Sequence, residues 1–183
     1  MAAMASRLPA SVENQPARWG SWLGVGVVFF LIAALLGILA SVFVPLRLHL
    51  QGAAASGFLV WSPEGDTALL GRSLTDVAAA DPKLGSYLVS FMDTMCSMMM
   101  GWGLVSLAVA WFALRRAHLW SYWTLVIAYL ATLVYYMIII PVTYAGAGAP
   151  VASGYVVLLG VYSPFVLGTI AAGIGLLRRR SRA

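Results

Sequence analysis

The sequence has very few charged residues. Only 9% of its 183 residues are Asp, Glu, Lys or Arg, whereas 62% are hydrophobic. A soluble domain typically carries about 25% charged residues. A chain with so little polar surface does not dissolve as a monomer, so the composition excludes an ordinary soluble domain and indicates a membrane protein.

Cysteine is almost absent as well. Cys96 is the single cysteine, which excludes an intramolecular disulfide and a CxxC redox pair, and with them a quinone-linked thiol enzyme. The sequence also lacks HExxH, GxSxG, Walker and glycine-rich phosphate motifs. Its two histidines, His49 and His118, stand apart and form no metal cluster with a carboxylate. We therefore expect no enzymatic activity.

What the chain does contain is four long apolar runs. They span about 19–45, 84–113, 119–142 and 152–177. Each exceeds the roughly 20 residues that cross a bilayer core, and none alternates like a barrel strand. Backbone groups in lipid must bond within the segment, so these runs predict helices. We predict an all-α membrane protein, a bundle of four transmembrane helices. The first run exceeds the about 7–15 residues of a signal h-region, so we expect it to remain as a helix.

The basic residues predict the orientation of this bundle. Eight of the eleven lie in the tail 1–18, between the second and third runs, or in the tail 178–183. Basic loops normally face the cytoplasm, so we predict a plasma-membrane protein with both termini cytoplasmic and the loop 46–83 outside. Since the basic tail flanks a membrane span, it predicts contact with the lipid bilayer and no binding of nucleic acid.

The outer loop 46–83 is too long to be a simple connector. "GFLVWSPEGDTALLG" at 57–71 predicts a small β-hairpin around a Pro/Gly/Asp turn. Ser73 with Asp76 predicts a helix start, and Asp81 before Pro82 predicts the cap of the second membrane helix.

Small residues recur at helical spacing in the first and last runs. Gly20 and Gly24 form a GxxxG motif, and Ala171 and Gly175 form a second small-xxx-small pair. Such residues let helices approach closely, within one bundle as readily as between copies.

The stretch "FMDTMCSMMMGW" at 91–102 combines a carboxylate, a thiol and five methionines. Met95 and Met99 form an MxxxM pair that resembles the pore motif of high-affinity copper transporters, which implies soft ligands for Cu(I). Those transporters have three helices and a GxxxG motif on the next helix, whereas this chain has four runs and no such motif there. Methionine also fills gaps in apolar cores. We prefer packing, and predict no cofactor; Met95, Met99 and Cys96 remain the weak candidates for a metal site.

Asp93 is the stronger lead, because a carboxylate inside an apolar run costs about 2.5–3.5 kcal/mol and usually faces the bundle or water. Hydroxyl groups at helical spacing on the third run offer partners, and three further polar residues lie near the outer mouth. The hydroxyl residues are Tyr129, Thr132 and Tyr136, and the mouth residues are Arg47, His49 and Lys83. Two hypotheses stay open: an outward-facing polar pocket, and a structural hydrogen bond.

The order of "SLTDVAAADPKLGSYL", a membrane run, "ALRRAHLWSYW" and another membrane run resembles a widespread kind of uncharacterised bacterial four-helix membrane protein. This resemblance implies no particular activity. The topology is also similar to that of claudin-like proteins, which have a β-containing first outer loop. The two loop cysteines and the Gly-Leu-Trp segment of claudins are absent from 46–83.

Two functions fit this chain. The first is a non-catalytic accessory or interaction subunit of a membrane assembly, with a protein partner or a second copy in the membrane. The alternative is a protein that binds or transports a small molecule, lipid or ion through an outward-facing pocket at Asp93.

Overall fold

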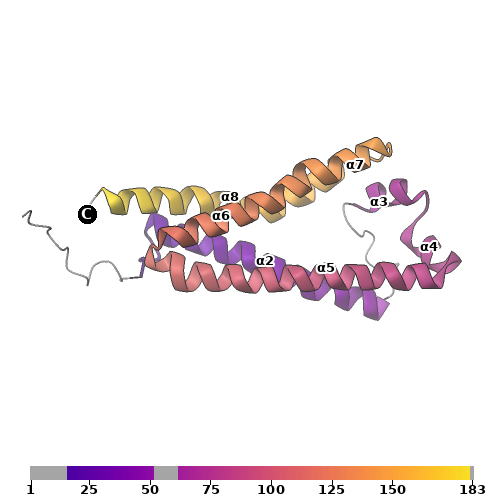
Figure 1. Ribbon diagram of the computed structural model, residues 1–183, viewed down its shortest axis with the longest axis horizontal. Coiled ribbons are helices and arrows are strands. Elements are labelled where there is room, and N and C mark those ends of the chain that lie inside the picture. Colours follow the sequence, from indigo (N-terminus) through magenta and orange to yellow (C-terminus); the bar gives the residue numbers. More distant parts are fainter. Residues whose placement is uncertain (1–15, 52–61, 182–183) are drawn as a thin grey trace, which may run out of the picture.

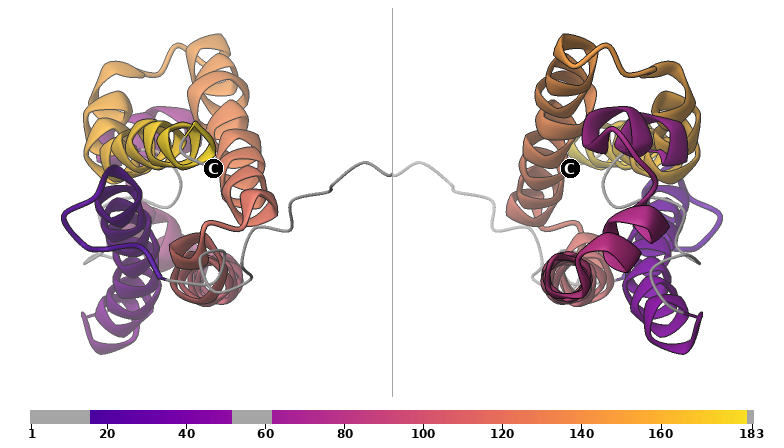
Figure 2. Two further views of the ribbon diagram at one scale, coloured as in Figure 1. Left: turned by 90° about the vertical axis from the view of Figure 1, so that its left-hand side faces the viewer. Right: turned by 90° about the vertical axis from the view of Figure 1, so that its right-hand side faces the viewer.

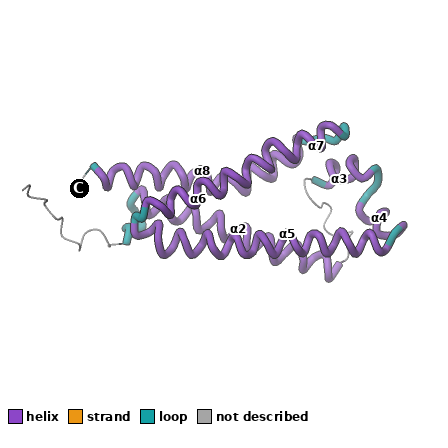
Figure 3. Tube along the Cα trace, in the orientation of Figure 1, coloured by secondary structure: helices purple, strands orange, loops and turns teal. Residues whose placement is uncertain are grey.

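Figure 1 shows a computed structural model of the protein, which describes residues 16–51 and 62–181. All regular elements of these two ranges are helical (Figure 3). Within the described residues, four spans are long and apolar enough to cross a membrane, which confirms that part of the predicted fold. These spans are Trp22–Leu50, Pro82–Arg116, Leu119–Gly146 and Leu158–Arg180.

The long helices differ in how regular they are. α2 (Trp22–Gln51) and α8 (Ala152–Arg180) are uninterrupted. α5 (Pro82–Ala108) continues into a π-helical turn, η2 (Val109–Ala113), and a 3₁₀ turn, η3 (Leu114–Arg116). A second π turn, η4 (Tyr135–Ile139), joins α6 (Leu119–Val134) to α7 (Ile140–Gly146). A π turn inserts a residue into the helical repeat, so the residues beyond it face a new direction.

α2 lies at the centre of the arrangement and packs against both α8 and α5. α6 packs on α8 and on η2, whereas α5 and α6 separate away from the turn that joins them (Figures 1 and 2). Aromatic side chains fill the core where α2, α6 and α8 meet. The ring of Tyr129 stacks on that of Phe165 at 4.9 Å, and Phe30 lies beside both.

Two glycines set how closely α2 and α8 approach. A Cβ atom on Gly26 would lie 2.4 Å from the backbone nitrogen of Ala172, and one on Gly175 would lie 2.4 Å from that of Leu23. Neither distance is possible between real atoms, so this contact requires glycine on each helix. Of the two small-residue pairs in the sequence, the one containing Gly175 thus lies at a helix contact inside the protomer.

α2 continues through Pro45 to Gln51, beyond the end expected at residue 45. Proline removes one backbone donor, but neighbouring groups and small local adjustments compensate for this in membrane helices. The extra turn and a half carries His49 onto a helix instead of into the outer loop.

The predicted β-hairpin at 57–71 is wrong for its described part, since Pro63–Leu70 forms helix α3. Ser62 caps this helix by accepting a hydrogen bond from the Gly65 amide, at 3.0 Å, and Pro63 occupies the first helical position. A capping serine followed by proline and an acidic first turn favours a helix start over a hairpin turn. Residues 57–61 of the predicted hairpin lie outside the described residues.

The two other predicted helix starts are confirmed. Ser73 Oγ accepts a hydrogen bond from the Asp76 amide at the start of α4 (Leu74–Ala80). Asp81 caps α5, accepting bonds from the amides of Lys83 and Leu84. α4 lies beside α5 and α3 beside α8, across one end of the bundle (Figure 2, right). We call this the cap end, and the opposite end, with the α5–α6 turn and the end of α8, the basic end.

Candidate functional site

A histidine and an aspartate face each other where α2 and α5 cross near the cap end. His49 Nε2 lies 2.9 Å from Asp93 Oδ2, and the two side chains are 60% and 35% exposed. An exposed pair of this kind contributes about 0–1 kcal/mol to stability. Stability alone therefore gives little reason for a carboxylate in this apolar helix.

The second carboxylate oxygen of Asp93 is the more informative atom. Oδ1 is buried and has no hydrogen-bond partner within the described ranges. A buried acceptor without a donor costs about 1–3 kcal/mol, and more when it is charged. This oxygen is therefore a candidate acceptor for a donor that lies outside the described residues.

An apolar cluster next to the pair packs α2 against α5. Leu48 of α2 packs against Met92 and Cys96 of α5, with Val44 and Val89 at the edge of this cluster. All three central side chains are buried. This packing fixes the position of α2 relative to α5, and so the positions of His49 and Asp93.

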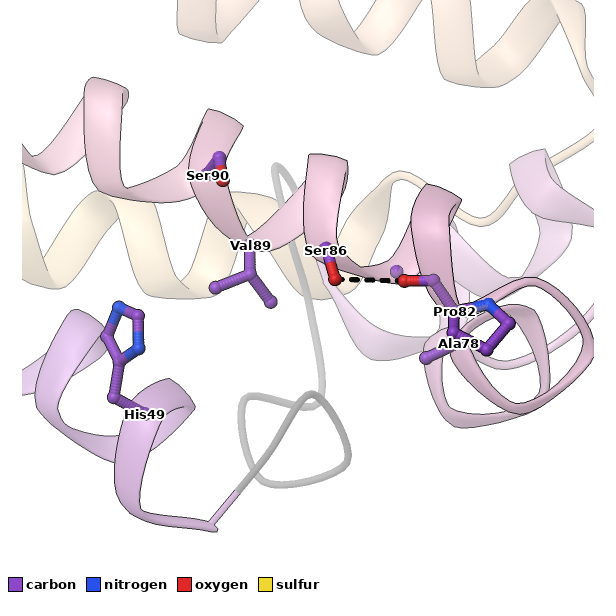
Figure 4. A pocket seen from close by; sticks show the side chains of 7 residues that line it. His49, Ala78, Pro82, Ser86, Val89 and Ser90 are labelled. Carbon is purple, nitrogen blue, oxygen red and sulfur yellow. Dashed lines mark hydrogen bonds between the residues drawn. The ribbon is translucent and has the colours of Figure 1, made fainter.

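His49 also lines a cavity of about 430 Å³ between α2, α4 and α5. Figure 4 shows the imidazole ring on one side and Val89 of α5 on the other. The remaining lining residues are Ala78, Pro82, Gly85, Ser86 and Ser90. Ser86 Oγ donates to the Pro82 carbonyl at 2.9 Å, which leaves its lone pairs as acceptors. The recess combines an apolar wall with acceptor groups.

The structure does not bring the predicted hydroxyl partners to Asp93. Tyr129 is buried in the aromatic core, Thr132 Oγ1 donates to the Ala128 carbonyl of its own helix, and the Tyr136 ring lies 6.3 Å from that of Tyr162. No hydrogen bond joins Asp93 to any of these three hydroxyl groups in the described part of the chain.

The sulfur atoms of the same stretch point to different faces of α5. Cys96 is buried against α2, whereas Met95 and Met99 are 37% and 36% exposed, at helical spacing with Trp102. The Trp102 ring lies 5.9 Å from the Tyr129 ring, so this face turns toward α6. The described ranges contain no group of three or more His, Cys, Asp or Glu side chains placed to hold a metal ion. Of the three candidate copper ligands, Cys96 is thus buried, whereas Met95 and Met99 are partly exposed.

The polar face of α5 is a feature that the sequence already contained. Ser86, Ser90, Asp93 and Ser97 recur at helical spacing within an apolar run, which places them on one side of the helix. Ser86 and Ser90 of this stripe line the recess together with His49, and Asp93 follows one turn later on α5, in contact with His49. Sequence analysis placed His49 near the outer mouth but not on a helix beside Asp93, because residue 45 was expected to end the first helix.

The chain matches no protein-family model, and no curated protein or solved structure matches it.

Proposed function

We propose that this chain is a multi-pass protein of the plasma membrane that binds a small molecule at its outward-facing recess. The ligand carries a cationic or hydrogen-bond-donating group, which bonds to Asp93. The buried Oδ1 atom of Asp93, without a partner in the described residues and next to the His49 contact, is the observation that carries this proposal.

The chemistry of the recess sets the class of ligand. An ionised carboxylate only accepts hydrogen bonds, and His49 already lies on Oδ2. An ammonium group on Oδ1 would form a charge-assisted bond, which is about twice as strong as a neutral one. The apolar wall formed by Ala78, Gly85 and Val89 suits a short hydrocarbon part. A volume of about 430 Å³ falls within the range of small-molecule pockets.

The charge distribution supports an outward-facing recess. Within the described residues, six arginines lie at the basic end and all five carboxylates lie toward the cap end. The arginines are Arg18, Arg115, Arg116, Arg178, Arg179 and Arg180, and the acids are Glu64, Asp66, Asp76, Asp81 and Asp93. Because basic ends normally stay in the cytoplasm, this asymmetry supports an orientation with the cap end outside.

Native mass spectrometry of the purified full chain tests the proposal. Wild-type protein is expected to retain a small molecule, and Asp93→Asn to lose it, because asparagine keeps the shape of aspartate but not its charge. Losing a charged hydrogen bond weakens binding about ten- to hundred-fold. Glu64→Gln removes an exposed carboxylate of α3 and should change nothing. Equal retention by wild type and Asp93→Asn would contradict the proposal.

A second variant keeps this test valid if Asp93→Asn folds poorly. Ser90→Leu fills the recess without altering the carboxylate or its histidine partner. Its bound molecule should be lost while its unfolding temperature stays near that of the wild type. Retention of the molecule in a folded Ser90→Leu protein would place the ligand elsewhere.

The separation of α5 from α6 favours a second candidate function, that of a non-catalytic accessory subunit. Several large side chains on α5 are exposed on the faces that α2 does not cover. They are Met95, Met98, Met99, Trp102, Leu104 and Val105. A transmembrane helix of another protein, or of a second copy, could pack there. Purification from native membranes in mild detergent distinguishes the candidates, since a stoichiometric protein partner would favour this one.

A further inference from the structure

A groove runs along the surface between α6 and α8 at the basic end, far from the His49 recess. It encloses about 280 Å³. Leu119, Tyr122 and Trp123 line it from α6, and Gly173, Leu177 and Arg180 line it from α8. Apart from Arg180 and the tyrosine hydroxyl, these side chains are apolar. The groove thus has long apolar walls and a cationic group at the end of the last span.

Gly173 leaves room for the Tyr122 side chain to lie against α8. A Cβ atom there would lie 3.1 Å from the Tyr122 hydroxyl oxygen, tighter than almost all real contacts. Because glycine has no Cβ atom, the Tyr122 side chain reaches the α8 backbone, and its hydroxyl donates to the Thr169 carbonyl at 3.3 Å. The hydroxyl proton of Tyr122 therefore already has an acceptor within the protein. A ligand in the groove does not need to accept it.

Arg180 differs from its neighbours in what it contacts. The Arg115 guanidinium lies between the rings of Trp19 and Trp111, at 4.5 and 4.9 Å, and Arg178 lies 5.5 Å from the Trp22 ring. These two cations are held by aromatic faces on or beside α2 and α5. Arg180 points to the groove instead, and it forms no ion pair with any residue in the described ranges.

We infer that this groove binds one anionic phospholipid, with its phosphate on Arg180 and an acyl chain along Leu119, Trp123 and Leu177. A guanidinium is suited to bidentate contact with phosphate. The described carboxylates all lie toward the other end of the molecule, so none of them competes for Arg180. The apolar walls select a lipid over free phosphate, because only a lipid supplies hydrocarbon to cover them.

Titration of the detergent-solubilised full chain with phosphatidylglycerol, followed by native mass spectrometry, tests the inference. Phosphatidylcholine with the same acyl chains is the neutral reference. The first phosphatidylglycerol should bind more tightly than phosphatidylcholine, and Arg180→Gln should weaken it about five-fold, the effect of one arginine at a membrane surface. Arg178→Gln removes an equal charge from the same helix turn, outside the groove, and should leave the first lipid bound as in wild type.

Several outcomes would overturn the inference. Equal binding of the two lipids, or equal weakening by Arg178→Gln and Arg180→Gln, would mean general charge attraction without a site. Competition by glycerol 3-phosphate, which has no acyl chain, would show a bare phosphate site. A dimer that Arg180→Gln dissociates would show a second copy in the groove.

A groove-filling variant probes the acyl chain separately from the headgroup. Leu177→Trp enlarges an exposed side chain of the groove wall and should weaken the first phosphatidylglycerol while the unfolding temperature stays close to that of wild type. Unchanged lipid binding by folded Leu177→Trp would overturn the placement of the chain. These measurements do not involve Asp93, so they stand apart from the proposed function.

Discussion

Tyr144 of α7 donates a hydrogen bond to Asp66 of α3, and both side chains are buried. The two residues are 78 positions apart in the sequence. Their bond joins the short cap helix to the end of the third membrane span. The cap is therefore tied to the bundle at a defined point.

Removing this bond should loosen the cap selectively. A hydrogen bond to a carboxyl group contributes about 1.5–3 kcal/mol when it is charged, so Tyr144→Phe should lower the local stability of α3 by about that amount. Hydrogen exchange of the α3 amides should accelerate while the amides of α8 stay unchanged. Tyr87→Phe alters an exposed tyrosine of α5 and serves as the control. Unchanged exchange in α3 would show that other contacts hold the cap.

The close approach of α2 and α8 gives a second prediction. Gly175→Ala places a methyl group where only 2.4 Å separates it from the Leu23 nitrogen, and overpacking of this kind costs about 1–3 kcal/mol. The unfolding temperature in detergent should fall. Gly160→Ala, on the same helix with open space around it, should leave this temperature unchanged or slightly higher. Similar behaviour of the two variants would contradict the described helix contact.

The membrane spans were predictable because a bilayer demands long apolar helices, and the caps at Ser73 and Asp81 were predictable because they are local. The error at α3 was also local. Pro63, Gly65 and Asp66 are turn formers when taken together, but a serine directly before the proline makes a helix start. The order of these residues carried more information than their composition.

The partner of Asp93 was harder to predict, because it depends on how the helices cross. A short turn joins α5 to α6, which suggested hydroxyl partners on α6 and beyond. The two helices separate beyond that turn, and the π turn η4 shifts the face on which Tyr136 lies. A periodic pattern shows which residues of a helix share a face, but not which helix that face meets.

The methionine pair on α5 gives a prediction about metal content. Cys96 is buried against α2, whereas Met95 and Met99 are partly exposed, and our prediction remains that the two methionines fill apolar space and bind no copper. Replacing both by leucine should cost less than about 1.5 kcal/mol and leave the metal content of anaerobically purified protein unchanged. Stoichiometric Cu(I) in wild type that disappears in the double variant would reverse this interpretation.

The orientation of the bundle can be measured on intact cells. In a Cys96→Ala background, Thr75→Cys places a thiol on exposed α4 at the cap end, and His118→Cys places one in the exposed α5–α6 turn. An impermeant thiol reagent should label position 75 and spare position 118 until the cells are lysed. The reverse pattern would put the basic end outside.

An experimental structure of the full chain in a lipid nanodisc tests the central claim most directly, because it shows what lies beside Asp93 Oδ1. The proposed site predicts non-protein density within hydrogen-bond distance, about 3 Å, continuing into the recess beside His49. Wild-type protein should show this density, and Asp93→Asn should not. A donor from the chain itself on Oδ1, with the recess closed by protein, would contradict the proposed ligand site.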